Sequence, residues 1–207
     1  MMVELDWANE KDVRAAADLH KKLLSDSLIP QLGNIFMTKF YYRDLIKDGL
    51  IKCNLYRQND DYVAFAVYTE YPFTFMAEGK RRHFLRLCLI LSLSIIAKPI
   101  RLMTIINALK VDNKRGSEGS TDNAGEMLSF GVLDSCRDIR DESTGLRIVN
   151  ILFDSAISYF RSKGFKKMYG EIRKSNLPSL LLWKSYGAVP EEVSCSQEGS
   201  AIFGVPL

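Results

Sequence analysis

Residues 140–145 have the composition of a phosphate-binding turn. They include an arginine, two hydroxyl side chains and Gly145, and an amphipathic run over 146–163 follows them directly. A turn of small residues lets successive backbone N–H groups point into one concavity. The first turn of a helix adds unpaired N–H groups and the positive end of its dipole. This combination predicts a binding site for a polyphosphate.

The flanking segments predict a strand before this turn and a helix after it. Residues 126–134 are short, apolar and bounded by Gly125 and a polar run, as expected for a buried strand. After the turn, apolar residues recur at helical spacing and predict a buried face. These residues are Leu146, Val149, Phe153, Ala156 and Phe160. The local order is therefore strand, turn, helix.

A second motif follows the first along the chain. Residues 171–176 have the pattern of a strand end followed by an asparagine, Asn176, that opens another helix. Pro178 suits the first turn of that helix. The pair Gly187 and Ala188 comes eleven residues after the asparagine. We therefore expect a second strand and helix after the first pair.

These two motifs resemble those of the GNAT superfamily of acyl-CoA-dependent N-acetyltransferases. The first family motif is Arg or Gln, two residues, Gly, one residue, then Gly or Ala. Arg140, Ser143 and Gly145 occupy its three positions, with Ser143 where the first Gly usually stands. The resemblance covers residues 126–205. Residues 32–42, together with a basic insertion, also resemble members of the superfamily that are associated with surface polysaccharide synthesis.

The resemblance implies an α/β fold, in which the fourth and fifth strands of a mixed central sheet splay apart. We expect one domain over residues 1–207, with a basic, apolar helical insertion and loop at 72–124 between the third and fourth strands. The N-terminal segments predict elements in matching order. They are a strand at 3–6, a helix capped by Asn9 or Asp12, a helix at 33–47 that ends near Gly49, and strands at 50–56 and 62–68 joined by a turn at 58–61.

For the donor, the resemblance implies acetyl-CoA as cosubstrate, with its pantetheine arm between the splayed strands. The exposed backbone of Leu133 and Ser135 is expected to bind this arm, and Asn176 is expected near the pantetheine or thioester end. The residues expected around the pyrophosphate are Arg140, Asp141, Ser143, Thr144, Gly145 and Leu146. Plainer interpretations are a solvated charge for Arg140 and helix capping for Ser143 and Asn176.

In such enzymes an amine attacks the thioester carbonyl directly, without a covalent enzyme intermediate. The candidate general bases are Glu126 and Glu171, with Glu70 as a further carboxylate and a water chain as the alternative. Trp183 stands where some members of the family carry a tyrosine general acid. Tyr186, almost one helical turn later, is the candidate replacement, and core packing is its alternative role.

The insertion is the most basic part of the chain. Residues 80–115 hold nine Lys or Arg and one acid, Asp112, which leaves a charge of −5 for the rest of a chain whose total is +3. The apolar run at 84–97 would span about 21 Å as a helix, too short to cross a bilayer. Three roles remain open. They are helices packed on the core near the acceptor, an interfacial pair on an anionic membrane, and a wall for an anionic acceptor such as a nucleotide-linked sugar.

Composition favours a reduced, cytoplasmic protein that has no metal site. The four cysteines lack CxxC spacing and no secretory signal opens the chain. His20 and His83 have no ligand partners at metal-binding spacing. The basic segment lacks interleaved aromatics, so we expect no nucleic-acid partner.

We predict an N-acetyltransferase that acts on a small amine, with an amino sugar as the suggested acceptor. The alternative is a catalytically inactive GNAT-like binding or scaffold protein that docks on a membrane or a partner through residues 80–115. Contact of the insertion with a membrane surface would place the protein at the periphery of that membrane. No oligomeric state is predicted.

Overall fold

The computed structural model describes residues 1–72, 74–106, 123–191 and 199–207. Seven strands form one sheet in the order β1-β2-β3-β4-β5-β7-β6. All neighbouring strands are antiparallel except β4 and β5, which are parallel. The strands are β1 (Met2–Glu4), β2 (Lys52–Gln58), β3 (Asp61–Thr69), β4 (Ala124–Val132), β5 (Lys167–Arg173), β6 (Val189–Glu191) and β7 (Ser200–Pro206). The expected mixed central sheet is confirmed.

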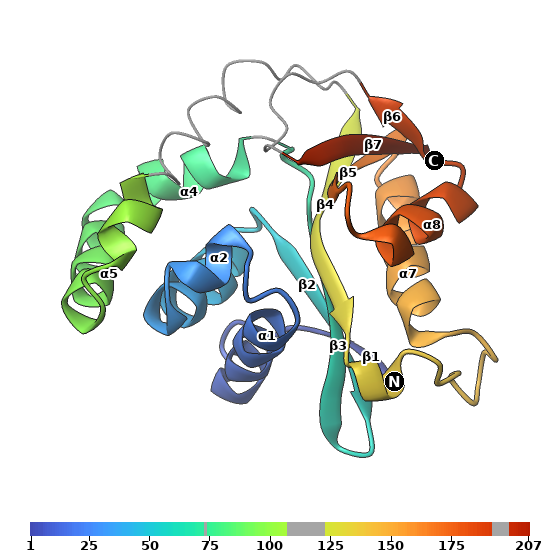
Figure 1. Cartoon of the computed structure of the whole chain (residues 1–207), viewed down its shortest axis with the longest axis horizontal. Helices are drawn as coiled ribbons and strands as arrows, with labels where there is room; N and C mark the ends of the chain where they lie inside the picture. Colours follow the sequence, from blue (N-terminus) through green and yellow to red (C-terminus); the bar gives the residue numbers. More distant parts are fainter. Residues whose placement is uncertain (73, 107–122, 192–198) are drawn as a thin grey trace.

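Helices cover both faces of this sheet (Figure 1). One side carries α1 (Glu10–Leu23), α2 (Leu28–Gln31), the π-helical segment η1 (Phe36–Asp44), α3 (Leu45–Lys47), α4 (Phe75–Arg82) and α5 (Phe84–Ala97). The other side carries α7 (Ile148–Ser162) and α8 (Leu177–Ser185), and a short 3-10 turn, η2 (Asp134–Cys136), follows β4. Two hydrophobic clusters result, one on each face.

Strand β3 shows how one sheet serves both clusters. Phe65 and Val67 belong to the cluster beneath α1 and η1, whereas Ala64, Ala66 and Tyr68 belong to the cluster beneath α7. Successive side chains of a strand point to opposite faces, so a strand buried on both sides is apolar throughout. The sheet therefore forms a rigid floor against which helices from both halves of the chain are placed.

Local sequence signals are confirmed where they concern caps and turns. The Asn9 side chain accepts a hydrogen bond from the Lys11 N–H at 3.0 Å and caps α1. Asn59 and Asp60 both have positive φ, at 48° and 69°, as the tight turn of a hairpin requires. Gly49 has φ of 70° just after α3, where a helix-ending glycine is expected.

The insertion differs from the expected pair of helices. Helix α4 was not predicted, because its many charged residues leave no clear apolar periodicity in the sequence, although Phe75 and Gly79 are buried. Helix α5 matches the expected run at 84–97, and residues 101–106 are helical, as expected for the start of the second helix. The remainder of that helix, and most of the loop expected at 112–125, lie outside the described residues. The helix expected at 33–47 contains the π-helical segment η1 in its middle.

In the described part of the chain, no helix combines the length and apolar character needed to cross a bilayer. The cysteines described there, Cys53, Cys88 and Cys136, are free thiols. Cys195 lies outside the described residues.

Replacing Gly125 by alanine should destabilise the fold, because the added Cβ would lie 2.1 Å from the ring of buried Phe160. We expect a loss of about 1–3 kcal/mol in the free energy of unfolding, measured by urea titration. The smaller side chain in Phe160→Leu should relieve part of this loss in the double variant. Strictly additive effects of the two substitutions would contradict the close packing of α7 on β4.

Candidate active site

The parallel strands β4 and β5 pair over only part of their length. Their ladder runs from Ala124, opposite Lys167, to Met127, opposite Gly170. Beyond that point β4 continues to Val132, while β5 continues in register with β7 alone. Figure 1 shows β4 extending well past the region where β5 lies beside it. One edge of β4 therefore leaves the ladder from Leu128 onward.

A β-bulge lies at the same place. On the β3 side, Val67 is opposite Ser129 while Tyr68 is opposite Met127, so Leu128 is an extra residue in β4. A bulge bends its strand and leaves the extra residue outside the ladder. The bulge and the end of β4–β5 pairing therefore coincide within one residue. Backbone polar groups of β4 from Leu128 onward are therefore not paired with β5.

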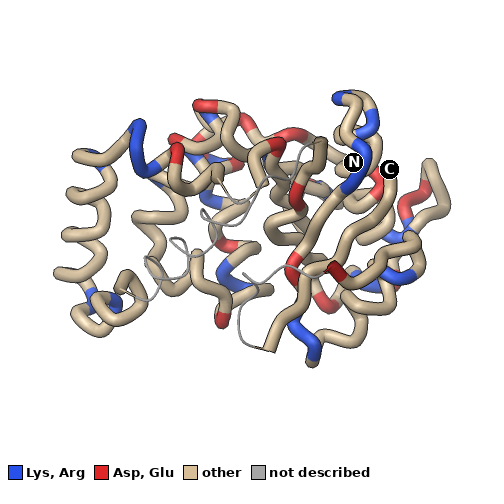
Figure 2. The backbone as a smooth tube through the Cα atoms, turned by 90° about the horizontal axis from the view of Figure 1, so that it is seen from above, with Lys and Arg blue, Asp and Glu red and all other residues tan. Residues whose placement is uncertain are grey.

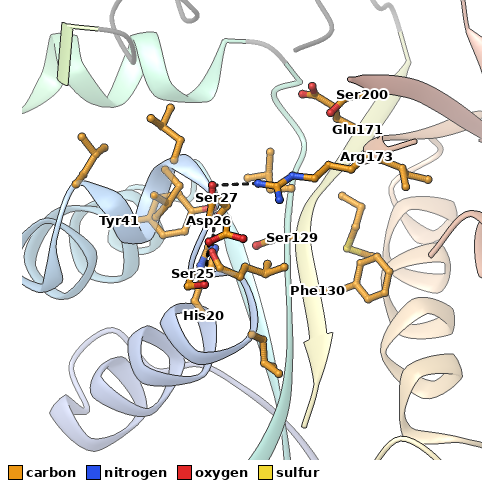
Figure 3. A pocket seen from close by; sticks show the side chains of 18 of the residues that line it. His20, Ser25, Asp26, Ser27, Tyr41, Ser129, Phe130, Glu171, Arg173 and Ser200 are labelled. Atoms are coloured by element: carbon orange, nitrogen blue, oxygen red, sulfur yellow. Dashed lines mark hydrogen bonds between the residues drawn. The ribbon is translucent and has the colours of Figure 1, made fainter. Parts of the chain in front are cut away.

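A cavity of about 650 Å³ opens at this divergence. One side is formed by β4 at Leu128, Ser129 and Phe130, by the end of β5, and by the start of α8. The opposite side is formed by the α1–α2 connection, η1, α4, α5 and Ile105. Figure 3 shows side chains from both sides converging on the space between them. The cavity thus joins the splayed strands to the insertion.

Arg173 links the two sides of the cavity. Its guanidinium Nη2 donates a hydrogen bond to the backbone carbonyl of Asp26 at 3.0 Å, from the end of β5 to the α1–α2 connection (Figure 3). These residues are 147 positions apart in sequence. Because no local pattern connects them, sequence analysis did not select Arg173.

His20 also lines the cavity and was not predicted as a functional residue. Its Nδ1 lies 2.8 Å from the hydroxyl of Tyr42, and the ring is buried. Burial lowers the pKa of His20 to about 4, so the ring is neutral at pH 7. Its position was visible in the helical spacing, since His20 continues the buried stripe of Val13, Ala16 and Ala17. Burial likewise raises the pKa of neighbouring Tyr41, which remains protonated.

The structure brings together Glu126 and Glu171, the two candidate general bases of the sequence analysis. Both line the cavity, and Glu126 has only 3% of its surface exposed. Glu70 lies elsewhere, where it accepts a hydrogen bond from the Tyr159 hydroxyl. Of the three carboxylates considered, two therefore remain near the divergence of the strands.

The structure does not bring Tyr186 to these glutamates. Its ring centroid lies 4.5 Å from that of Phe153, within the cluster beneath α7, and it is not among the cavity-lining residues. Burial raises the pKa of Tyr186, with a further contribution from its hydrogen bond to Asp154. Its placement corresponds to the core-packing role considered for it from the sequence.

Trp183, which stands where the family resemblance implied a tyrosine in some members, lies on the cavity wall. It is 1% exposed, and a side chain at Gly170 would approach its ring to 2.2 Å. Phe153 packs against it edge-on, at 5.0 Å between ring centroids. The indole Nε1 is buried without a hydrogen-bond partner in the described structure. Such a donor is costly unless a ligand accepts from it.

Asn176 caps α8 and also lines the cavity. Its side-chain oxygen accepts a hydrogen bond from the Ser179 N–H at 3.2 Å. Since the cap uses the carbonyl oxygen, the NH₂ group is the part that can donate to a ligand. The capping role predicted for Asn176 is confirmed.

The turn at 140–145 is held by one of its own carboxylates. Asp141 Oδ1 accepts from the backbone N–H groups of Ser143 and Thr144, each at 3.0 Å, and from the Ser143 hydroxyl. The Asp141 carboxylate also accepts a hydrogen bond from the Tyr56 hydroxyl. The Ser143 and Tyr56 hydroxyls hold the pKa of Asp141 well below its usual range. The expected open nest of N–H groups is thus partly filled by Asp141.

The helix after this turn begins later than expected. Arg147 is the N-cap residue of α7 and makes no side-chain cap, so Ser143 does not cap this helix and Leu146 precedes it. Arg140 Nη1 donates to the Gly145 carbonyl at 2.8 Å, and Gly145 has φ of 68° with open space around its Cα. Two arginines therefore flank the N-terminal end of a 15-residue helix.

Two residues expected on β4 lie past its end. Leu133 follows the last strand residue, and its N–H donates to the Val63 carbonyl at 2.9 Å. Ser135 lies in the 3-10 turn that follows. The expectation that Leu133 and Ser135 supply open strand backbone is therefore corrected, because the open edge of β4 comes earlier, from Leu128 to Val132.

Comparisons with known proteins show the fold. No protein-family model and no curated protein sequence matches the chain. Among solved structures, the ribosomal-protein-alanine N-acetyltransferase of Brucella melitensis has a TM-score of 0.58 and 13% identity, with 100% of this chain and 99% of that chain covered. A GNAT-family acetyltransferase from Staphylococcus aureus Mu50 has a TM-score of 0.56 and 8% identity, with 100% and 98% covered. The PaiA N-acetyltransferase of Thermoplasma acidophilum, solved with coenzyme A, has a TM-score of 0.54 and 9% identity, with 100% and 99% covered. The chain therefore has the GNAT fold.

The buried neutral His20 predicts a loss of stability on the acid side. Below about pH 6.5 the unfolded chain takes up a proton on this residue, whereas the folded chain does so only near pH 4. Stability should therefore rise with pH across this window, by about 3 kcal/mol in total. Urea titrations at pH 4 to 7.5 should show a smaller pH dependence in His20→Gln than in the wild type. Equal pH dependence in both would contradict the assigned burial.

Proposed function

We propose that the chain is an acetyl-CoA-dependent N-acetyltransferase that acts on a small amine. The observation that carries this proposal is the opening of β4 and β5 at the Leu128 bulge, directly onto a cavity with two buried or half-buried glutamates. Such an opening gives one substrate access to strand backbone and lets a second substrate reach it from the opposite side. Both substrates of a direct transfer are then held by rigid elements of the fold.

The residues present suit an acyl-CoA donor. Its pantetheine arm would lie along the open edge of β4 and offer carbonyl groups to the Asn176 amide. The buried indole N–H of Trp183 adds a donor that has no acceptor among the described residues. The pyrophosphate would lie at the N-terminal end of α7 beside Arg140 and Arg147, because Asp141 already fills part of the preceding turn.

Transfer then requires three contributions from the protein. Glu126 or Glu171, directly or through water, takes the proton that the ammonium must lose before its nitrogen attacks the thioester carbonyl. Backbone N–H groups at the Leu128 bulge stabilise the negative charge that develops on the carbonyl oxygen. The C–S bond breaks, and the departing thiolate is stabilised by hydrogen bonding rather than by a tyrosine acid.

The amino-sugar acceptor suggested by the sequence stays a prediction. The acceptor side of the cavity offers many aliphatic and aromatic side chains, including Leu32, Phe36, Phe75 and Leu91. Sugar hydroxyls need hydrogen-bond partners, and each one left without a partner in a buried site costs affinity. We therefore propose only that the acceptor is a small amine.

Calorimetric titration with acetyl-CoA tests the donor site. We expect micromolar binding by the wild type and at least tenfold weaker binding by Gly145→Asp, which adds a negative charge beside the proposed pyrophosphate site. Gly145→Asn is the matched control, because asparagine has nearly the same shape, tolerates positive φ and is neutral. It should bind nearly as well as the wild type.

Equal affinity of wild type and Gly145→Asp would exclude this turn as the pyrophosphate site. Absence of acetyl-CoA binding by the wild type would exclude the proposed enzyme. That result would favour the GNAT-like scaffold alternative.

A second role, in addition to catalysis, is supported by the outer face of α5. Large apolar side chains there are exposed in a single stripe, which we call the α5 stripe. It consists of Leu85, Leu89, Leu93 and Ile96, each exposed over at least half of its surface. Figure 2 shows Lys or Arg at both ends of this helix, which projects from the left of the molecule. Residues 75–106 carry six Lys or Arg against Glu78 alone, a net charge of +5.

We propose that the α5 stripe binds an anionic membrane surface. Aliphatic side chains enter the headgroup region while flanking basic residues remain at the anionic surface. A second copy of the chain is a poorer occupant, since a symmetric contact would place one +5 segment against another. A protein partner is less favoured because the stripe lacks the Trp, Tyr and Arg residues that dominate protein interfaces.

Vesicle flotation tests this second role. The wild type should float with vesicles that contain phosphatidylglycerol, less so at high salt, and Leu89→Asp should reduce the bound fraction at least tenfold. Leu181→Asp, at a comparably exposed leucine on α8, is the matched control and should bind like the wild type. No flotation of the wild type, or equal loss in both variants, would refute membrane binding by the stripe.

A further inference from the structure

The acceptor side of the cavity is built by segments that differ in character from the donor side. Apolar residues come from three sources there: α2 and η1, the insertion helices α4 and α5, and Ile105. Insertion residues Phe75, Leu87 and Ile105 are each less than 9% exposed, so they form a packed wall of the cavity. The insertion therefore shapes the space that an acceptor must occupy.

Helix α5 has one face toward the cavity and carries the α5 stripe on its outer face. Leu87 and Leu91, one turn apart, face the cavity, and Ser94 on the same side donates a hydrogen bond to the Leu32 carbonyl. This bond anchors the helix to the C-terminal end of α2, and Arg101 Nη1 donates a hydrogen bond to the Ser94 carbonyl at 3.3 Å. The inward face is thus held in place independently of any contact made by the α5 stripe.

Of the charged residues that line the cavity, Lys80 of α4 lies on the side of this apolar wall, and the others lie away from it. Glu126 lies in β4 two residues before the bulge, and Glu171 lies where β5 leaves β4. Asp26 and Arg173 lie at the connection between the two sides, where Figure 3 shows them joined. His20 and Tyr41, deeper inside, are both uncharged at pH 7. A bound ammonium is therefore favoured beside the divergent strands, with the remainder of the molecule against uncharged and apolar groups.

We infer that the acceptor is a primary amine with an extended apolar body, an alkylamine or arylalkylamine rather than a polyamine or an amino sugar. The inference rests on the proposed acetyl transfer and specifies its substrate class. The amine nitrogen forms the new amide bond, the thioester C–S bond breaks, and the proton released by nitrogen passes to a carboxylate and from there to the thiolate or to solvent. The apolar body lies between η1 and the insertion helices.

The apolar wall disfavours the other acceptor classes. A second ammonium on a polyamine would be placed against Leu87, Leu91 and Phe36, where a charge without a partner is strongly disfavoured. Sugar hydroxyls placed against the same three residues would lose hydrogen bonds to water without regaining them. Each methylene buried on this wall is instead worth about fourfold in affinity or in kcat/KM.

The test compares butylamine, hexylamine and octylamine with spermidine and glucosamine, and measures release of CoA thiol from acetyl-CoA. For the wild type we expect kcat/KM to rise about fourfold per methylene. Leu91→Gln introduces a polar side chain of similar size and should flatten this rise, lowering octylamine turnover at least tenfold while butylamine changes little. Ser92→Gln places the same side chain on an exposed neighbour that does not line the cavity, and should match the wild type.

Calorimetry separates failure of this inference from failure of the proposed function. If the wild type binds acetyl-CoA but turns over butylamine and octylamine equally, or prefers spermidine or glucosamine, the acceptor class is overturned and acetyl transfer stands. If acetyl-CoA does not bind, the proposed acetyl transfer is refuted. Titration with octylamine alone then tests whether the cavity binds an apolar amine. Octylamine binding that is lost in Leu91→Gln and kept in Ser92→Gln supports an apolar amine site, and absence of such binding overturns it.

Discussion

Backbone hydrogen bonding along β4 is the constraint on which the remainder of this structure depends. A buried strand must find partners for its N–H and C=O groups. Strand β4 is paired with β3 from Glu126 to Val132, apart from the bulged Leu128, but with β5 only from Ala124 to Met127. The bulge at Leu128 adds a residue where this pairing stops. The polar edge of β4 beyond the bulge needs water or a bound molecule as its hydrogen-bond partner. The sheet itself therefore provides a place for a ligand. The cavity, its glutamates and the capping asparagine of α8 are all arranged around that edge.

The divergence is maintained by packing on both sides. Gly170 allows the Trp183 ring to lie against β5, and Phe153 of α7 holds that ring from the opposite side. On the other face, Arg173 reaches across to the α1–α2 connection. These contacts join the N-terminal and C-terminal halves of the chain without closing the cavity. Packing thus accounts for a tryptophan at position 183, whose Nε1 has no hydrogen-bond partner among the described residues.

The segment from α4 to Ile105 has two different faces. Its inward residues extend the cavity with apolar groups, while its outward residues form the α5 stripe between basic ends. One helix can serve both purposes because residues on opposite faces of a helix vary independently. An amine with an apolar body and an anionic membrane surface are compatible occupants, since such amines partition toward membranes. The two proposals nevertheless rest on different residues and are tested separately.

The sequence by itself determined the features that depend on neighbouring residues. The caps at Asn9 and Asn176, the hairpin at Asn59 and the order of strands and helices other than α4 follow from local periodicity and turn chemistry, and the family motifs pointed to the fold. Only the tertiary structure decided which distant groups meet. It placed Glu126 and Glu171 at one cavity and Glu70 outside it, ended β4 before Leu133, filled the 140–145 turn with Asp141, and moved His20 into the site. These outcomes depend on strand register and on contacts between residues far apart in sequence, which no local pattern encodes.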